Sequence, residues 1–131
     1  MSETFTGHCL CGALSIELKG RPKRVSLCHC RMCARHTGAP FVHLAVYDAP
    51  DVAVTGETYG YESSRGVDRR GCKDCGAPAY IYVEDSDEFE IYVGVLDEPS
   101  EFPPQYEIFD EHRPSWLGDI DNVPTYKAYR D

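Results

Sequence analysis

The alternation of apolar and polar residues along the chain is mainly that of β-strands. Residues 13–18 alternate in this way, and residues 41–47 are rich in aromatic and β-branched side chains. Residues 78–83 and 89–95 have the same character, so each of these four segments is predicted to form a strand. The polar residues 84–88 lie between the last two segments and suit the turn of a hairpin. The pattern therefore predicts a mainly β fold.

A helical turn is predicted for one short segment, residues 31–37, which Gly38 and Pro40 are expected to end. No low-complexity tract or linker divides the chain, and 131 residues make one domain with a modest core. Residues 1–131 are therefore predicted to form a single domain. Trp116, in a proline-containing loop, is expected to anchor that loop to the core.

Charge is distributed unevenly along the chain. Residues 1–75 contain ten Lys and Arg against eight Asp and Glu, whereas residues 76–131 contain three against fourteen. The net charge of the whole chain is −9 at pH 7. A protein with this charge repels nucleic acid, because nucleic-acid binding depends on neutralising phosphates. Nucleic acid is therefore not an expected partner.

The cysteine content and the lack of membrane signals predict a reducing compartment. No apolar stretch approaches the roughly 18 residues that a membrane helix needs, and residues 1–7 lack the basic start and apolar run of a signal peptide. We therefore expect a cytoplasmic protein with no membrane partner. Persistent disulfides are rare there, and seven cysteines cannot all pair within one chain. Thiolate chemistry is the expected role of these residues.

The seven cysteines form three tight clusters, and this is the most informative feature of the sequence. The first cluster is Cys9-x-Cys11, the second is Cys28-x-Cys30-x-x-Cys33, and the third is Cys72-x-x-Cys75. Spacings this short place sulfurs on one loop, where they can share a metal ion but seldom reach disulfide geometry with each other. The clusters therefore predict zinc binding.

Two zinc ions per chain are the expected number, because a closed structural site takes four protein ligands whereas a reactive site keeps one position free. The first and third clusters together supply four sulfurs, and Gly76 eases the tight turn after the third. Such a site would fasten the start of the chain to its middle. The second cluster supplies three sulfurs and leaves a position for water, substrate or a nearby side chain. The spacing also permits a single zinc ion and three free cysteines.

Titratable and charged residues around the second cluster are candidates for binding a ligand. His36 follows Cys33 by three residues and is a candidate fourth ligand or proton carrier. His29 lies between two cysteines, and a neighbour of a metal ligand usually points away from the metal. Arg31 and Arg35 are candidates for receiving a small anionic ligand. Three further arginines near the clusters share this property: Arg65, Arg69 and Arg70.

The three clusters and the end of the chain together form a specific signature. The cysteine motifs are Gly7-x-Cys9-x-Cys11-Gly12, Cys28-His29-Cys30-x-x-Cys33-x-x-x-Thr37-Gly38 and Cys72-x-x-Cys75-Gly76. The closing segment contains Ile108-Phe109, then Arg113-Pro114-x-Trp116, then Val123-Pro124-x-Tyr126. Over most of the chain these motifs resemble the glutathione-dependent formaldehyde-activating enzyme family, which also includes centromere protein V. Glu107 departs from the pattern, since many members have histidine before the Ile-Phe pair.

The resemblance implies a fold and a set of metal ligands. The implied fold is the Mss4-like fold, in which several coiled antiparallel β-sheets are fastened by zinc. The implied ligands are Cys9, Cys11, Cys72 and Cys75 for a structural zinc ion, and Cys28, Cys30 and Cys33 for a second, catalytic one. Arg31, Arg35 and His36 are the residues expected to bind substrate beside the second ion.

The resemblance also implies a reaction, in which the thiol of glutathione adds to formaldehyde and gives S-hydroxymethylglutathione. This is the work of a carbon–sulfur lyase acting in reverse, so the expected partners are glutathione or a similar small thiol and a small aldehyde. A function of a different class also fits the residues: a zinc-stabilised β module that binds a protein partner or a small thiol without catalysis. A thiol redox switch fits less well, because the short spacings favour metal.

Overall fold

The computed structural model describes residues 3–130 and confirms the mainly β fold expected from the sequence. Its strands are β1 (Thr4–His8), β2 (Ser15–Lys19), β3 (Arg24–Cys28), β4 (Val42–Asp48), β5 (Val52–Thr55), β6 (Thr58–Ser64), β7 (Val67–Cys72), β8 (Pro78–Val83), β9 (Glu88–Tyr92) and β10 (Tyr106–Ile108). The helical segments are α1 (Arg31–Thr37) and short 3-10 turns at Ala49–Asp51, Val93–Val95, Pro99–Glu101 and Asp110–His112. A membrane-spanning helix is not found among residues 3–130.

The larger of two sheets has seven strands in the order β10-β3-β4-β9-β8-β7-β6. Strands β10 and β3 run parallel, and every other neighbouring pair is antiparallel. Strands β8 and β9 form the predicted hairpin, in which Val83 lies opposite Glu88 and a turn joins the two strands. The order means that β3 and β7, which are far apart in sequence, belong to one continuous surface.

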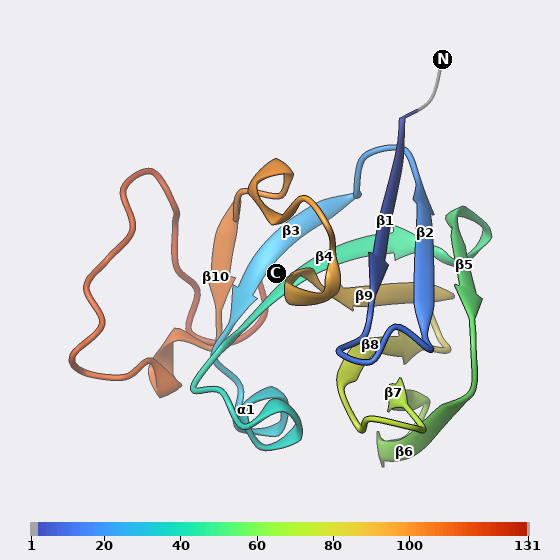
Figure 1. The fold of residues 1–131 in the computed structure, drawn as a ribbon. Coiled ribbons are helices and arrows are strands. Elements are labelled where there is room, and N and C mark those ends of the chain that lie inside the picture. Colours follow the sequence, from blue (N-terminus) through green and yellow to red (C-terminus); the bar gives the residue numbers. More distant parts are fainter. Residues whose placement is uncertain (1–2, 131) are drawn as a thin grey trace.

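The smaller sheet, with the order β1-β2-β5, packs across one face of the larger sheet (Figure 1). Exposed and buried residues alternate along β1 and β2, and this alternation directs Phe5, Ile16 and Leu18 into the space between the sheets. Tyr47 and Ile91 of the larger sheet are almost fully buried in the same core. Because this core uses only one face of the larger sheet, the opposite face is available to form a site.

The helix α1 begins and ends where the sequence predicted. Cys30 is its N-cap, and the Cys33 N–H donates to the Cys30 Sγ at 3.2 Å. Gly38 ends it in the left-handed conformation, with φ at 79°, and donates its N–H to the Ala34 carbonyl at 2.7 Å. The helix therefore fixes Cys30 and Cys33 directly after the end of β3.

The strand predicted over residues 89–95 is shorter than expected, because β9 ends at Tyr92 and the next three residues form a 3-10 turn. The cause is a close crossing with β1, where Leu96 pairs with Gly7. A Cβ atom at Gly7 would lie 2.5 Å from the Val95 carbonyl oxygen, so only glycine permits this approach. The chain leaves the larger sheet after Tyr92 in order to reach the smaller one.

The prediction that Trp116 anchors its loop to the core is wrong, since this side chain is 73% exposed. Arg113 holds the loop instead, by donating hydrogen bonds to the carbonyls of Leu117 and Gly118 and to the carboxylate of Glu107. Figure 1 shows the loop, in orange to red, extending away from both sheets. Hydrogen bonds to backbone carbonyls therefore hold this loop, and burial of the indole ring does not.

Candidate metal centres and cavity

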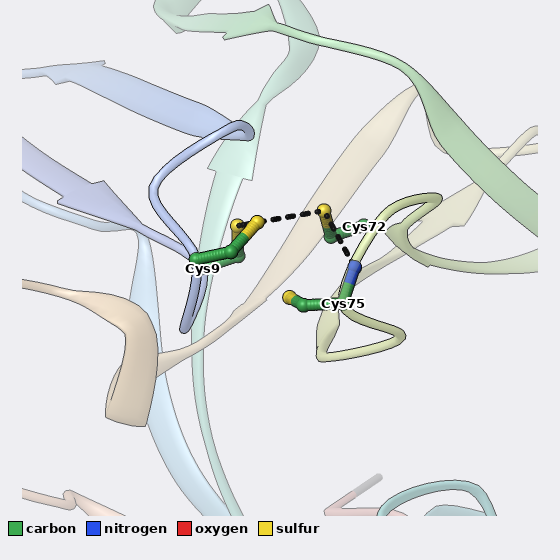
Figure 2. A group of neighbouring side chains, drawn as sticks. Cys9, Cys72 and Cys75 are labelled. Carbon is green, nitrogen blue, oxygen red and sulfur yellow. Dashed lines mark hydrogen bonds between the residues drawn. The ribbon is translucent and has the colours of Figure 1, made fainter.

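Four cysteine sulfurs meet between the loop after β1, which carries Cys9 and Cys11, and the end of β7, which carries Cys72 and is followed by Cys75; Figure 2 labels three of them. The four Sγ atoms lie within 4.8 Å of one another. The Sγ of Cys11 is 3.6 Å from that of Cys9 and 3.7 Å from that of Cys72. A tetrahedral zinc ion with bonds of about 2.3 Å needs sulfurs about 3.8 Å apart. The residues of this four-sulfur cluster therefore fit zinc.

Backbone N–H groups support the four-sulfur cluster. Leu14 donates its N–H to the Cys9 Sγ at 3.3 Å, and Cys75 donates its N–H to the Cys72 Sγ at 3.5 Å. Burial by itself raises the pKa of the Cys9 thiol, but the Leu14 N–H and the neighbouring thiols bring this pKa down to about 6. Gly76 then turns the chain in the left-handed conformation, with φ at 77°. Backbone donors therefore face two of the four sulfurs, those of Cys9 and Cys72.

Three further sulfurs, those of Cys28, Cys30 and Cys33, also lie within 4.8 Å of one another. Cys28 ends β3, Cys30 caps α1, and Cys33 lies in the first turn of that helix. Cys28 and Cys33 are buried, whereas Cys30 is partly exposed. The structure thus groups the seven sulfurs as four and three, which is the division expected from the sequence. That these groups bind zinc stays a prediction.

A cavity of about 760 Å³ lies on the face of the larger sheet that the core does not use. Alternate residues of six strands form its floor, because the pleat directs them to one side; on β3 these residues are Arg24, Ser26 and Cys28. Helix α1 and the segments around Phe109 and Tyr129 form the walls. All three sulfurs of the three-sulfur cluster line this cavity, and within residues 3–130 those of the four-sulfur cluster do not.

The cation beside the three-sulfur cluster is Arg69 of β7. Its side chain is 5% exposed, and its Nη1 lies 3.4 Å from the Cys33 Sγ. The guanidinium also donates to the Ser63 Oγ at 2.9 Å and to the Tyr92 hydroxyl at 3.5 Å. Hydrogen bonds from the two other thiols, with a smaller contribution from the charge of Arg69, lower the pKa of Cys30 to about 2. The cluster therefore holds negative charge beside a fixed cation.

The structure separates the three side chains that the sequence assigned to substrate binding. Arg31 is exposed and lines the cavity, whereas Arg35 is exposed on the same helix and does not line it. The Nδ1 of His36 lies 2.7 Å from the Tyr92 hydroxyl, and its ring is not grouped with the three sulfurs. Burial, together with the charge of Arg69, lowers the pKa of His36. The structure thus places His36 outside both the cluster and the cavity.

His29 is fully buried and points away from the sulfurs on either side of it, as expected for a residue between two ligands. Its Nε2 lies 2.7 Å from Oε1 of Glu107, and the Arg113 Nη1 donates to the same oxygen at 2.7 Å. Burial raises the pKa of Glu107, but these two hydrogen bonds outweigh it and leave this pKa below its usual range. Glu107 does not line the cavity. Glu107, the residue that departs from the family pattern, is therefore buried against His29 and Arg113 and lies outside the cavity.

The end of the cavity furthest along β3 from Cys28 is charged. Arg24, four residues before Cys28, donates its Nη2 to Glu88 at 2.9 Å, and the Lys23 Nζ lies 2.6 Å from the same carboxylate. Burial raises the pKa of Glu88, but these two cations bring it down to about 2. Glu90, the next residue of β9 on the same face, also lines the cavity. The site thus has a sulfur-rich end and an end with paired charges.

Arg69 and Glu90 are the site residues that the sequence left unassigned. Arg69 was one of five arginines near the clusters, and nothing in its spacing distinguished it from Arg65 or Arg70. The signal lies in the strand itself: along β7, Val67 and Arg69 face the cavity, whereas Asp68 and Arg70 pair with each other at 2.7 Å. Predicting a strand over residues 67–72 would have separated Arg69 from Arg70 by face.

The two donor sets suit the same metal in different roles. Thiolate sulfur favours zinc among the common divalent ions, and four thiolates complete its tetrahedral shell. Three thiolates leave one position for an exchangeable ligand, at a place that the cavity reaches. The arrangement is therefore able to combine a closed site with an open one.

Comparison with known proteins identifies a family whose sequence model matches this chain. A sequence model of the glutathione-dependent formaldehyde-activating enzyme matches residues 4–112. An uncharacterized lyase of Schizosaccharomyces pombe is 30% identical over 77 residues, which are 59% of this chain and 56% of that protein. The chain thus spans little more than half the length of this relative.

A crystal structure of a Rhodobacter sphaeroides protein has a similar fold, with a TM-score of 0.59 and 20% sequence identity. The similarity covers 92% of this chain and 99% of that one. At this level of identity the likeness concerns the arrangement of the strands and not the chemistry of the site.

Proposed function

Because this chain belongs to the glutathione-dependent formaldehyde-activating enzyme family, we propose that it adds the thiol of glutathione or a similar peptide to formaldehyde or another small aldehyde. This is the reaction of a carbon–sulfur lyase run in the direction of addition. The observation that carries the proposal is the three-sulfur cluster in the wall of a cavity of about 760 Å³. A volume of this size is typical of sites for small ligands.

The chemistry needs a thiolate and a polarised aldehyde. Cys28, Cys30 and Cys33 would hold a zinc ion, which would supply the acidity that converts a bound thiol to a thiolate near neutral pH. The sulfur then bonds to the aldehyde carbon, the C=O double bond becomes a single bond, and the oxygen takes up the proton that the thiol released. Nothing is oxidised or reduced, so no further reactant is needed.

The chain's own residues set the conditions for this step. Three thiolates around a divalent ion leave one net negative charge, which opposes the approach of another anion. Arg69, buried 3.4 Å from the Cys33 Sγ, offsets that charge. Leu44 and Ile81 in the floor make the surroundings apolar and strengthen the effect of Arg69. Arg69 thus takes the electrostatic role that the sequence offered to Arg31 or Arg35.

The test is the rate at which S-hydroxymethylglutathione forms from glutathione and ¹³C-formaldehyde, measured by NMR exchange spectroscopy. The two reactants also combine without help, so the measurement compares the exchange rate at several protein concentrations with that of the buffer. We expect a rate proportional to protein concentration, and a return to the background rate with Cys30→Ser. Circular dichroism spectra of both proteins show whether the fold is retained.

Two other results would decide against the proposal. An unchanged exchange rate together with a saturable effect of glutathione on the visible spectrum of the cobalt-substituted protein indicates a thiol-binding module without catalysis. An unchanged rate and an unchanged spectrum indicate that both metal sites are structural.

A further inference from the structure

Glu90 contributes a carboxylate to the floor of the cavity. It lies on β9, is partly buried, and lines the cavity beside apolar residues. Among the residues that the structure describes, none forms a hydrogen bond or an ion pair with its side chain. Glu88, two residues earlier on the same face, differs from Glu90 because it forms ion pairs with Arg24 and Lys23.

The strand register explains why Glu90 is left alone. It lies in a row across the sheet in which Arg24 pairs with Val46, Val46 with Glu90, Glu90 with Ile81, and Ile81 with Arg69. The two nearest neighbours in the row are therefore apolar. The two cations lie two strands away on either side, at about 10 Å between Cα atoms.

Both cations of this row are already engaged. The Arg24 guanidinium donates to both oxygens of Glu88, at 2.9 and 3.3 Å. The Arg69 guanidinium is held by Cys33, Tyr92 and Ser63. Neither guanidinium hydrogen-bonds to Glu90, so the cavity floor has one carboxylate more than its cations satisfy.

Such a carboxylate is unfavourable in the free protein. Burial raises the pKa of Glu90, since the charged form loses hydration that no neighbouring donor replaces. An exposed glutamate on a polar surface would have no such penalty. A partly buried, unpaired carboxylate in a cavity is a typical feature of a ligand site, because a cationic group of the ligand supplies the missing partner.

We propose that Glu90 binds the ammonium group of the thiol substrate, so that the cavity selects small peptides in which a free amino group and the thiol lie on different residues. This inference rests on the proposed function and names the substrate class of the same site. Arg31, an exposed residue that also lines the cavity, is available to attract a carboxylate of the same ligand.

The dimensions of the floor set the separation between the two ends of the ligand. Arg69, which contacts the Cys33 Sγ at 3.4 Å, lies in the same row as Glu90 but two strands away, at about 10 Å between Cα atoms. In cysteine the ammonium and the sulfur are attached to adjacent carbons, so one molecule is too short to reach both groups. In glutathione the ammonium lies on the neighbouring γ-glutamyl residue, and an extended molecule comes much closer to this span.

The test uses a ligand whose sulfur is blocked, so that it reports the charged subsite without chemistry. We would measure the dissociation constants of S-methylglutathione and of its N-acetyl derivative by calorimetry on the wild-type protein, Glu90→Gln and the control Glu17→Gln. Glu17 is exposed on β2 of the smaller sheet and does not line the cavity. Wild type and control are expected to bind the free-amine ligand about tenfold more tightly than the acetylated one, as for a charge-assisted hydrogen bond. Glu90→Gln should bind the two ligands equally.

The outcomes separate this inference from the proposed function. Equal affinities of the wild-type protein for the two ligands, or a tenfold preference that survives in Glu90→Gln, overturn the ammonium subsite whether or not the exchange rate is accelerated. Unchanged affinities with a slower turnover in Glu90→Gln overturn it as well, because they make Glu90 a proton donor. A preference that Glu90→Gln removes, in a protein that does not accelerate exchange, supports the subsite and contradicts catalysis.

Discussion

The two cysteine clusters contain the same kind of donor in opposite settings. The four-sulfur cluster joins loops of the two sheets, and its Cys11 and Cys72 are 61 residues apart in the chain. The three-sulfur cluster comes from one short segment, Cys28 to Cys33, and lines the cavity beside Arg69. Backbone N–H groups support the first cluster, whereas a buried guanidinium supports the second.

From this difference we infer that separation in sequence, and not donor type, favours a structural role for the four-sulfur cluster and a reactive role for the three-sulfur cluster. Closing a loop of 61 residues removes much of the freedom of the unfolded chain, so metal at the four-sulfur cluster stabilises the whole fold. Closing a loop of a few residues constrains the unfolded chain far less. We therefore expect that a ligand can exchange at the three-sulfur cluster with little effect on the stability of the fold.

The largest expected effect is that of Cys72→Ser on stability. This change removes one of four ligands from the cluster that joins the sheets, and we expect a loss of about 3 kcal/mol or more, or a fall in Tm of roughly 10–20 °C. Thermal unfolding followed by circular dichroism measures it, with Cys30→Ser as the matched control. The same fall in Tm for both variants would remove the distinction between the clusters.

The second effect concerns the metal and the activity. Cys30→Ser is expected to lower the zinc content from about two ions per chain to about one, to abolish thiol addition, and to leave Tm within about 3 °C of the wild type. Elemental mass spectrometry, on protein purified without a chelator or a metal-affinity tag, measures the zinc. Retention of two zinc ions by this variant contradicts the assignment of Cys30 as a ligand.

Arg69→Gln tests the cation that distinguishes the second cluster. Loss of a hydrogen bond between charged groups corresponds to about 2 kcal/mol, so kcat/KM for thiol addition should fall about 30-fold. The visible spectrum of the cobalt-substituted protein should shift as well, because the guanidinium contacts a ligand sulfur. Arg69→Lys keeps the charge and should recover part of the activity. A spectrum and kinetics like those of the wild type would show that the charge of Arg69 has no effect on the three-sulfur cluster or on the reaction.

Glu88 provides a pH test in which the metal clusters affect both proteins equally. Its pKa in the fold is about 2, below the ordinary value of 4.5, so its ion pairs stabilise the fold above pH 4.5. This contribution, about 3 kcal/mol at most, is lost as the pH falls through 2. We expect the free energy of unfolding to depend less on pH between 4.5 and 2 in Glu88→Gln than in wild type, because loss of metal at low pH is common to both proteins. Identical pH profiles would contradict the pairing of Glu88 with Arg24 and Lys23.

The smallest effect separates the two arginines of α1. Arg31→Ala is expected to raise KM for glutathione by up to about fivefold, since an exposed charge contributes at most about 1 kcal/mol. Arg35→Ala should leave KM unchanged, because Arg35 does not line the cavity. Steady-state kinetics on both variants test this, and an equal rise in KM would place Arg35 in the site after all.

Elements with a strong local pattern were predicted correctly from the sequence. The segment β8 and the helix α1 have the predicted bounds, since an aromatic and β-branched run and a helix-ending glycine act locally. Strands β6 and β7 were not predicted, because their sequences, TYGYESS and VDRRGC, are largely polar. They form because neighbouring strands supply hydrogen bonds to their backbones.

The sequence by itself determined the donor chemistry of this protein. Thiolates at short spacing must lie close together whatever the rest of the chain does, so the pairs and the triplet of cysteines could be identified without a structure. Only the tertiary structure decided what faces them. Arg69 reaches Cys33 from a strand 36 residues away, and Glu90 faces the cavity because the register of the sheet directs it there. The cause is physical: spacing fixes contacts within a loop, whereas contacts between distant segments depend on how the whole sheet assembles.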